Sequence, residues 1–225
     1  IEPEAGFAVR VGDRIEITAC TQSPYIDLGE CARVLGIGHD AVRIIPSSCG
    51  GGFGGKLDLS VQPLLAVAAW TLKRPVRCVY TRIESMASTT KRHPATLRAR
   101  AAADADGNLL TIDMSVDFNT GAYASWGPTV ADRVPVHGSG PYRVPNVRVA
   151  TRAIYTNDPP AGAFRGFGIP QAAILQEQLY DDLALKLKID PFEFRARNAL
   201  RAGQPTATGQ VLESSVGPTQ RPDAP

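Results

Sequence analysis

Hydrophobic and polar positions first alternate with the period of a strand and then recur with the period of a helix. The first pattern predicts strands at Phe7–Val11 and Arg14–Cys20, joined by a turn at Gly12-Asp13. Apolar residues at helical spacing predict a helix over Ile26–Leu35, and Gly36 is typical of a helix end. The chain is therefore expected to begin with mixed strands and helices.

The same alternation continues through the next part of the chain. Val42–Ile45 is predicted to be a short buried strand, and a glycine cluster follows it at Gly50–Gly55. Asp58–Lys73 has the pattern of a helix that Arg74-Pro75 breaks. Val76–Tyr80 is the next predicted strand.

The middle of the chain has longer strands and irregular segments. Leu97–Ala103 and Leu109–Phe118 are predicted strands, and Asp104–Asn108 between them is a strong hairpin signal. Gly121–Asn146 is rich in Gly and Pro and is interpreted as an ordered loop. Val147–Tyr155 is predicted to be a further strand.

The last third of the chain is predicted to be mainly helical. After a second Gly/Pro-rich loop at Asn157–Gly168, Pro170–Lys186 has the strongest helical pattern in the chain. Asp190 is the expected N-cap of another helix that runs through Leu200. The tail is polar, and its end is expected to be disordered.

These elements indicate an α+β fold with mixed sheets and packed helices. No internal repeat and no interdomain linker is visible before residue 203. We therefore expect one region over 1–203 and a polar tail over 204–225.

The formal net charge of +2 gives no reason to expect nucleic acid or an anionic membrane as a partner. The longest apolar run, near Leu64–Trp70, is too short to span a membrane. No signal peptide is visible, which predicts a cytoplasmic protein. Because the chain lacks an initiator Met, we expect that it starts inside a longer polypeptide.

The cysteines and histidines do not form a recognisable metal motif. The spacings of Cys20, Cys31, Cys49 and Cys78 fit no metal or iron–sulfur pattern. Buried or half-buried free thiols in a reducing compartment are expected instead. The histidines are widely separated along the chain and predict no shared metal site.

The glycine-rich run Gly50–Lys56 carries the first candidate chemistry. Its exposed backbone N–H groups, followed by a predicted helix, suit an oxyanion or a phosphate, although a tight glycine turn is the structural alternative. The run also matches the start of a P-loop. Leu57 stands where that motif needs a hydroxyl for Mg²⁺, which argues against a nucleotide hydrolase.

Three further segments are candidates for ligand contact. In Ala163–Gln171 an arginine lies between aromatic residues and glycines, where it could bind an oxo group or carboxylate or else cap a loop. In Thr21–Pro24 the Gln22 amide could donate a hydrogen bond, although a surface turn is the simpler interpretation. Thr89–Pro94 is a basic turn that could contact phosphate but is expected to be a solvated loop.

Together these motifs resemble the molybdopterin-binding region of the xanthine dehydrogenase/aldehyde oxidase family. The resemblance covers nearly the whole chain, from Ile1 to about Gly217. It rests on an ordered set of short segments: the Glu2-Pro3-Glu4-Ala5 opening, Thr21-Gln22, GGGFGGK at 50–56, Lys91-Arg92-His93-Pro94, Tyr142 with Val144-Pro145-Asn146, AFRGFG with Pro170-Gln171, and Asp190-Pro191 with Glu193, Arg195 and Asn198.

The resemblance implies a role for individual residues around a molybdenum that has no direct protein ligand. Gln22 would hydrogen-bond an oxo ligand of the metal, and Arg165 would approach the metal from another side. The backbone of Gly52, Phe53 and Gly54 would lie against the cofactor. Phe167 and Arg133 would contact the substrate, together with Leu57.

The resemblance also implies the reaction and the other components of the enzyme. Family members oxidise aldehydes or N-heterocycles with water as the oxygen source, using molybdopterin, expected here as the cytosine dinucleotide. Iron–sulfur clusters, and in some members FAD, lie on partner domains or subunits. The family's base glutamate lies beyond the end of this chain, so no catalytic residue is expected within it, and the remaining molybdopterin-binding part is an expected partner.

The substrate and the alternatives depend on a few positions. Purine-oxidising members have a glutamate where Leu57 stands, so xanthine is not the expected substrate. A non-catalytic relic or assembly module of the same fold is the main alternative. Retention of Gln22, Phe53, Arg165 and Phe167 argues against it, because a scaffold does not need them.

Overall fold

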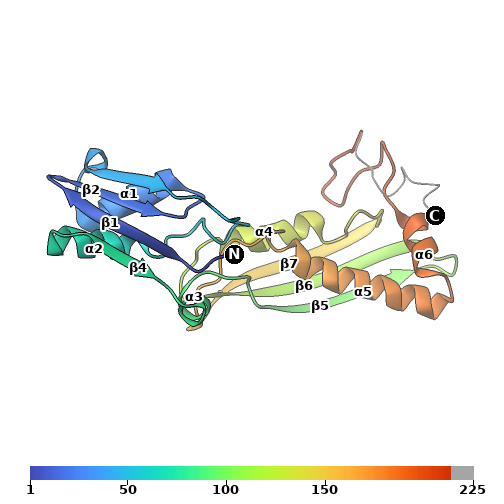
Figure 1. The fold of residues 1–225 in the computed structure, drawn as a ribbon. Coiled ribbons are helices and arrows are strands. Elements are labelled where there is room, and N and C mark those ends of the chain that lie inside the picture. The colour runs from blue at the N-terminus through green and yellow to red at the C-terminus, as the bar shows by residue number, and fades with distance from the viewer. Residues whose placement is uncertain (214–225) are drawn as a thin grey trace. The chain divides into compact units, whose positions relative to one another are not determined.

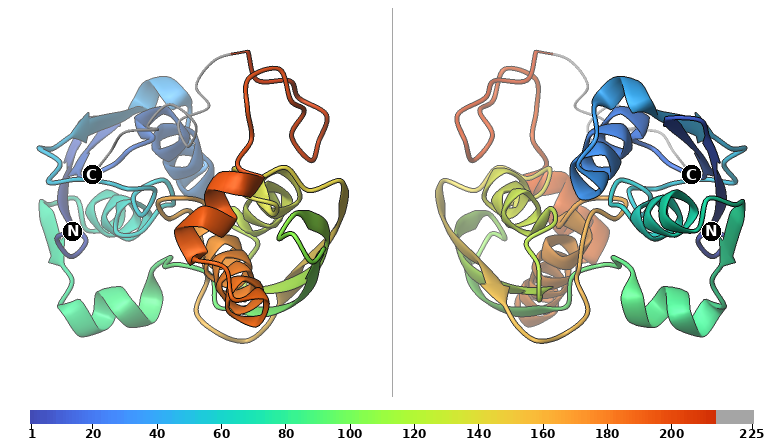
Figure 2. Two further views of the ribbon diagram at one scale, coloured as in Figure 1. Left: turned by 90° about the vertical axis from the view of Figure 1, so that its right-hand side faces the viewer. Right: turned by 90° about the vertical axis from the view of Figure 1, so that its left-hand side faces the viewer.

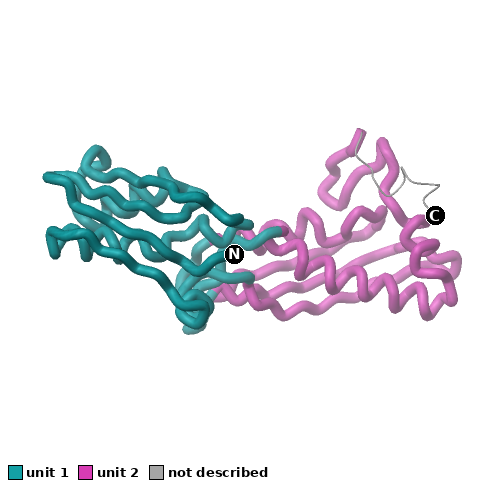
Figure 3. The backbone as a smooth tube through the Cα atoms, in the orientation of Figure 1, with its two compact units in different colours: residues 1–92, 121–125, 156–165 teal, residues 93–120, 126–155, 166–225 magenta. Residues whose placement is uncertain are grey.

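The computed structural model describes residues 1–213 and divides into two compact units, each built from separate segments of the chain (Figure 3). The first unit contains Ile1–Arg92, Gly121–Ser125 and Thr156–Arg165. The second unit contains His93–Thr120, Trp126–Tyr155 and the chain from Gly166 onward.

The first unit is built on a mixed four-stranded sheet with the order β3-β2-β1-β4 (Figure 1). β1 (Ala5–Val11) and β2 (Arg14–Ala19) form an antiparallel hairpin, and Gly12 takes a φ of 61° in its turn. β4 (Val76–Val79) pairs antiparallel with β1. β3 (Val42–Pro46) pairs parallel with β2, so both strands end at the same edge of the sheet.

Two helices bury the apolar side of this sheet (Figure 2). α1 (Pro24–Leu35) ends at Gly36 in a left-handed conformation, and α2 (Gln62–Leu72) packs against both α1 and β1. The buried side chains that form this core include Ile15, Ile17, Cys31, Leu65, Ala66 and Ala69. A short 3₁₀ helix, η1 (His39–Ala41), leads into β3, and α3 (Arg82–Ser88) follows β4.

The second unit is a three-stranded sheet with two helices packed on it. β5 (Ala95–Ala103), β6 (Leu109–Gly121, whose last residue belongs to the first unit) and β7 (Asn146–Tyr155) lie in that order. Burial alternates along the strands, as expected for a sheet with one solvated face. α4 (Gly127–His137) contacts β7, and α5 (Ile169–Leu187) contacts β5 and α4.

A final helix, α6 (Pro191–Asn198), closes one end of the second unit. The Asp190 side chain accepts hydrogen bonds from the N–H groups of Phe192 and Glu193, as an N-cap does. At the other end of the helix, Asn198 Oδ1 accepts from Leu109 N at 2.7 Å and its Nδ2 donates to Gly107 O at 2.8 Å. One buried amide therefore ties α6 to the β5–β6 hairpin.

The structure confirms the α+β fold with mixed sheets and most predicted elements. The paired strands, their hairpins and the helices that end at Gly36 and begin near Pro170 and Pro191 lie where the pattern placed them. No helix within residues 1–213 is long and apolar enough to cross a membrane. The expected disorder at the end of the tail falls on residues 214–225, outside the described part.

Several local predictions are wrong. Gly121–Asn146 is not only a loop, because it contains α4, whose internal Pro135 hid the helical pattern. The helix predicted from Asp58 begins only at Gln62, since Asp58 accepts hydrogen bonds from Ser125 instead. In the strand predicted as buried, only Val42 is fully buried.

One expectation about exposure is also wrong, and the expectation of buried or half-buried thiols fails at Cys49 alone among the cysteines. The basic turn at Thr89–Pro94 is not a solvated loop, because Thr89, Thr90 and His93 are buried. Cys49 is exposed, whereas Cys31 is buried and Cys20 and Cys78 are half-buried.

Replacing Asn198 with Ala should destabilise the protein by about 2–3 kcal/mol, because the buried Leu109 N–H and Gly107 C=O both lose their partner. Asn146→Ala is the matched control, since its exposed amide donates only to Leu110 O. Urea unfolding followed by circular dichroism measures the free energy of unfolding of both variants. Equal losses of stability in the two variants would contradict the anchoring role of Asn198.

Candidate functional site

The glycine-rich segment after β3 folds into consecutive tight turns. Gly55 N donates to Gly52 O at 2.9 Å, and Leu57 N donates to Gly54 O at 3.2 Å. Gly51 and Gly54 have φ values of 110° and 89°, which glycine tolerates far better than other residues. Phe53 also has a positive φ, and its ring is 48% exposed, so a large apolar side chain is presented at the surface of the loop.

Gln22 holds this loop through its side-chain carbonyl. Gln22 Oε1 accepts hydrogen bonds from Gly54 N at 3.0 Å and from Lys56 N at 3.2 Å. Both partners are donors, so the atom in contact with them must be the oxygen. The amide NH₂ of this exposed side chain has no hydrogen-bond partner within residues 1–213 and is available to an acceptor.

Two glycines are required by close packing on either side of the loop. A Cβ at Gly52 would collide with the side-chain amide of Gln22. A Cβ at Gly54 would lie 3.0 Å from the carbonyl of Ala163 and 3.1 Å from Phe164 N. The loop backbone is thus wedged between the residues after β2 and the segment that contains Arg165.

Arg165 presents a positive charge beside the loop. Its Cζ lies 5.8 Å from the centroid of the Phe53 ring, and its guanidinium makes no ion pair with any described residue. The backbone of this segment is held by Arg92, whose guanidinium donates to Arg165 O at 2.6 Å and stacks on Phe164 at 4.7 Å. The Arg165 guanidinium is therefore exposed, while the backbone of Arg165 is held in place by Arg92.

A pocket of about 490 Å³ lies beside these residues in the first unit. Its lining combines Gly55 and Phe164 with the cationic side chains of Arg82, Lys91 and Arg92. Glu2 and Glu4 also line it. The basic turn at Thr89–Pro94, a candidate for anion contact in the sequence, therefore borders a cavity through Lys91 and Arg92, which are half-buried.

Lys56 is committed to a structural role. Its side chain is only 8% exposed, and its ammonium forms an ion pair with Glu2 and donates to Cys20 Sγ at 2.9 Å. The hydrogen bond from Lys56 lowers the pKa of Glu2 to about 2. A lysine held in this way does not reach out to a nucleotide phosphate, which agrees with the sequence argument against a P-loop.

Leu57 is half-buried directly after the loop. The carboxylate of the next residue, Asp58, accepts hydrogen bonds from Ser125 Oγ at 2.9 Å, and burial raises its pKa. Asp58 is therefore held within the first unit and does not replace the glutamate that purine-oxidising family members have at the position of Leu57.

Arg133 and Phe167 belong to the second unit and are described with it. Arg133 is exposed on α4. Phe167 has a φ of 49°, is half-buried, and meets the Trp126 ring edge-on with the centroids 6.3 Å apart. A Cβ at Gly168 would lie 2.5 Å from Val130 O, so the segment after Phe167 packs closely on α4.

The sequence did not reveal two groups of residues. The stacking of Arg92 on Phe164 and the cluster of Glu2, Cys20, Cys49 and Lys56 join segments that are far apart in the chain. Cys20 and Cys49 follow β2 and β3, so a prediction that these strands are parallel neighbours would have placed the two cysteines together. The strand order was not predicted from the sequence.

The residues of the first unit suit a ligand that presents oxygen acceptors. They offer the amide NH₂ of Gln22 and the guanidinium of Arg165, neither of which donates a hydrogen bond to any residue in the described range 1–213, beside a tightly packed glycine loop. Such a set binds oxo groups or phosphates without ligating a metal directly. These residues therefore fit the molybdopterin that the sequence resemblance implies.

Comparison with known proteins agrees with this fit. The family model described as the molybdopterin cofactor-binding domain matches residues 1–199. The nicotinate dehydrogenase large molybdopterin subunit of Eubacterium barkeri is 47% identical over 96% of this chain and 51% of its own length. A probable xanthine dehydrogenase subunit of Bacillus subtilis is 41% identical over 97% of this chain and 29% of its own length.

Solved structures give the same result. The aldehyde oxidoreductase from Desulfovibrio gigas superposes with a TM-score of 0.87 at 33% identity, over 93% of this chain and 23% of that chain. This chain thus spans about half, or less, of the length of the relatives that it matches. The match over residues 1–199 and the shared fold show that the chain belongs to the molybdopterin cofactor-binding domain family of the molybdenum hydroxylases.

Proposed function

We propose that this chain cradles the molybdopterin of a molybdenum hydroxylase and lines part of its substrate site. The observation that carries the proposal is the arrangement of Gln22, Gly54 and Arg165. The Gln22 side chain anchors the glycine loop through its oxygen and keeps its NH₂ available, while the Arg165 guanidinium lies beside the Phe53 ring of the same loop.

Each residue then has a distinct task. Gln22 donates its amide hydrogens to an oxo ligand of the metal, and Arg165 adds a positive charge that favours an anionic group. The backbone of Gly52, Phe53 and Gly54 is held in place by close packing on Gln22, Ala163 and Phe164, and this fixed loop would lie against the cofactor. When bound, the molybdopterin supplies the metal at which the substrate loses two electrons and gains oxygen from water.

The substrate is proposed to be an N-heterocycle or an aldehyde. Phe167 would provide an aromatic wall, Arg133 a charge for a polar or anionic substituent, and Leu57 an apolar contact in place of the purine-binding glutamate. The relative in Eubacterium barkeri is a nicotinate dehydrogenase, and a solved relative is an aldehyde oxidoreductase. The sequence similarity favours a heterocyclic substrate, since the first of these relatives shares more residues with this chain.

The remaining components are proposed to come from partners. The residues assigned here bind the cofactor and orient the substrate, and no general base is assigned among them. A second molybdopterin-binding part would supply the base glutamate, and iron–sulfur and FAD-containing partners would carry the electrons away. We further propose the cytosine dinucleotide form of the pterin, a single cofactor-binding region over 1–203 and a cytoplasmic location.

A non-catalytic relic of the same fold is less well supported. A scaffold would not need to keep the Gln22 NH₂ and the Arg165 guanidinium beside the same glycine loop without hydrogen-bond acceptors among residues 1–213.

Gly54→Ala should lower the molybdenum and pterin content of the purified assembly by roughly tenfold, the effect of about 1.4 kcal/mol on binding. The added methyl group meets Ala163 and Phe164 and displaces the loop from Gln22. Metal analysis of equal amounts of assembled protein gives the ratio.

Gly209→Ala is the matched control, because Gly209 has a similar φ of 84° but open space around it. It should retain the molybdenum content of the parent protein. A Gly54→Ala assembly that is folded and fully loaded would refute the cradle.

Gln22→Glu should lower kcat with a heterocyclic or aldehyde substrate by about 10–100-fold while the molybdenum content stays within twofold. The carboxylate still accepts from Gly54 N and Lys56 N but can no longer donate. Gln210→Glu, at an exposed position, controls for the added charge. Unchanged kcat in a loaded Gln22→Glu enzyme would show that the donor has no role.

A further inference from the structure

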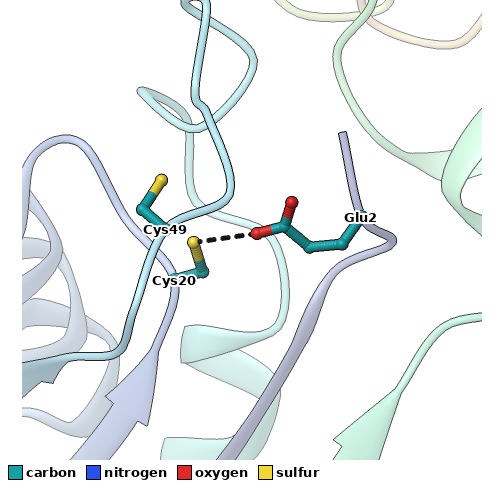
Figure 4. A group of neighbouring side chains, drawn as sticks. All are labelled: Glu2, Cys20 and Cys49. Atoms are coloured by element: carbon teal, nitrogen blue, oxygen red, sulfur yellow. Dashed lines mark hydrogen bonds between the residues drawn. The ribbon is translucent and has the colours of Figure 1, made fainter.

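Two cysteines that the proposed function does not use lie together beside the glycine loop. Cys20 directly follows β2 and Cys49 lies shortly after β3, and the parallel register that pairs Ala19 with Pro46 brings these two strand ends together. The Sγ atoms and a carboxylate oxygen of Glu2 all lie within 4.8 Å of one another (Figure 4).

The two thiols differ in exposure and in the groups around them. Cys49 is exposed, whereas Cys20 is half-buried and donates to Glu2 Oε1 at 3.4 Å. The Lys56 ammonium lies between them, 2.9 Å from Cys20 Sγ and 3.6 Å from Cys49 Sγ. The Cys49 thiol is therefore accessible to a solute, and the Cys20 thiol lies next to it.

The electrostatics favour the same division of roles. Hydrogen bonds from Cys20 and from the Gly51 N–H, with the charge of Lys56, lower the pKa of Cys49. Burial raises the pKa of Cys20. The exposed sulfur thus has more thiolate character, and the thiolate is the reactive form of cysteine.

A metal ion is a poorer occupant of this cluster. The position between the three donor groups already holds the Lys56 ammonium, which is ion-paired with Glu2. A divalent cation would have to displace a buried positive charge and, among residues 1–213, would find three protein ligands. Structural zinc sites use four ligands.

We propose that Cys49 and Cys20 form a peroxide-reactive dithiol that closes to a disulfide. The Cys49 thiolate attacks one peroxide oxygen, the O–O bond breaks, and the products are a sulfenic acid at Cys49 and hydroxide, which takes a proton to become water. The Cys20 sulfur then attacks the Cys49 sulfur and displaces the hydroxyl group, which leaves as water with the Cys20 proton. Two thiols lose two electrons, and one peroxide is reduced to two waters.

The position of this dithiol allows its oxidation to affect the glycine loop. Cys20 precedes Thr21-Gln22, and Cys49 precedes Gly50, so a disulfide would link the two segments that meet at the hydrogen bonds from Gly54 and Lys56 to Gln22. This chemistry does not require that the loop bind molybdopterin, so it stands or fails independently of the proposed function.

The test is disulfide mapping on the enzyme purified with all its associated polypeptides. The assembly is reduced, freed of reductant, treated with a small excess of hydrogen peroxide and alkylated. It is then digested with trypsin without reduction. Mass spectrometry should find peptide 15–33 linked to peptide 44–56, with fragment ions that place the bond on Cys20 and not Cys31.

Variants separate the two steps. Cys20→Ser should stop the reaction at the sulfenic acid, so that dimedone labels Cys49 roughly tenfold more than Cys78. Cys49→Ser should abolish the linked peptides, and Cys78→Ser should leave them unchanged. The proposal is overturned if no Cys20–Cys49 link forms, if Cys49 links to a different cysteine, or if dimedone labels Cys49 no more than Cys78 in the Cys20→Ser variant.

Discussion

The hydrogen bonds from the Gly54 and Lys56 N–H groups to Gln22 Oε1 are the interaction on which the rest of the site depends. They join the end of β2 to the turn after β3 and fix which end of the Gln22 amide faces outward. The loop held by these bonds packs closely on its neighbouring residues, so that only glycine fits at Gly52, beside Gln22, and at Gly54, beside Ala163. The same contacts shape the loop and leave an N–H donor available to a ligand.

The parallel pairing of β2 with β3 makes this interaction possible. Because parallel strands end at the same edge of a sheet, two segments separated by α1 meet there. The buried Lys56 ammonium stabilises this meeting point, because it forms an ion pair with Glu2 near the N-terminus and donates to the sulfurs of Cys20 and Cys49. A buried cation with one partner removed would be costly, so these segments stabilise one another.

The sequence predicted those features that depend on local patterns. The hairpin at Gly12-Asp13, the Gly36 helix end and the Asp190 N-cap each need only a few neighbouring residues. α4 was missed because Pro135 lies inside it, and its apolar face becomes evident only against β7. The division into two units could not be predicted either, since each unit is assembled from segments that interrupt the other.

The candidate site shows the same limit. Gln22, the glycine run and Arg165 were recognised through motifs, and the structure brings these residues of the first unit together around Phe53. Glu2, Arg92 and Ala163 stand in recognised motifs, but their contacts with these residues were not predicted, because contacts between distant segments have no signature in spacing.

The most direct test of the central claim is the molybdenum and pterin content of the assembly, purified with all its polypeptides from a molybdate-supplied host. Metal analysis, together with identification of the nucleotide that acid hydrolysis releases, measures both. The account predicts close to one molybdenum and one pterin for each copy of this chain. A folded, fully assembled protein without either would contradict it and would favour a relic that keeps the fold without the cofactor.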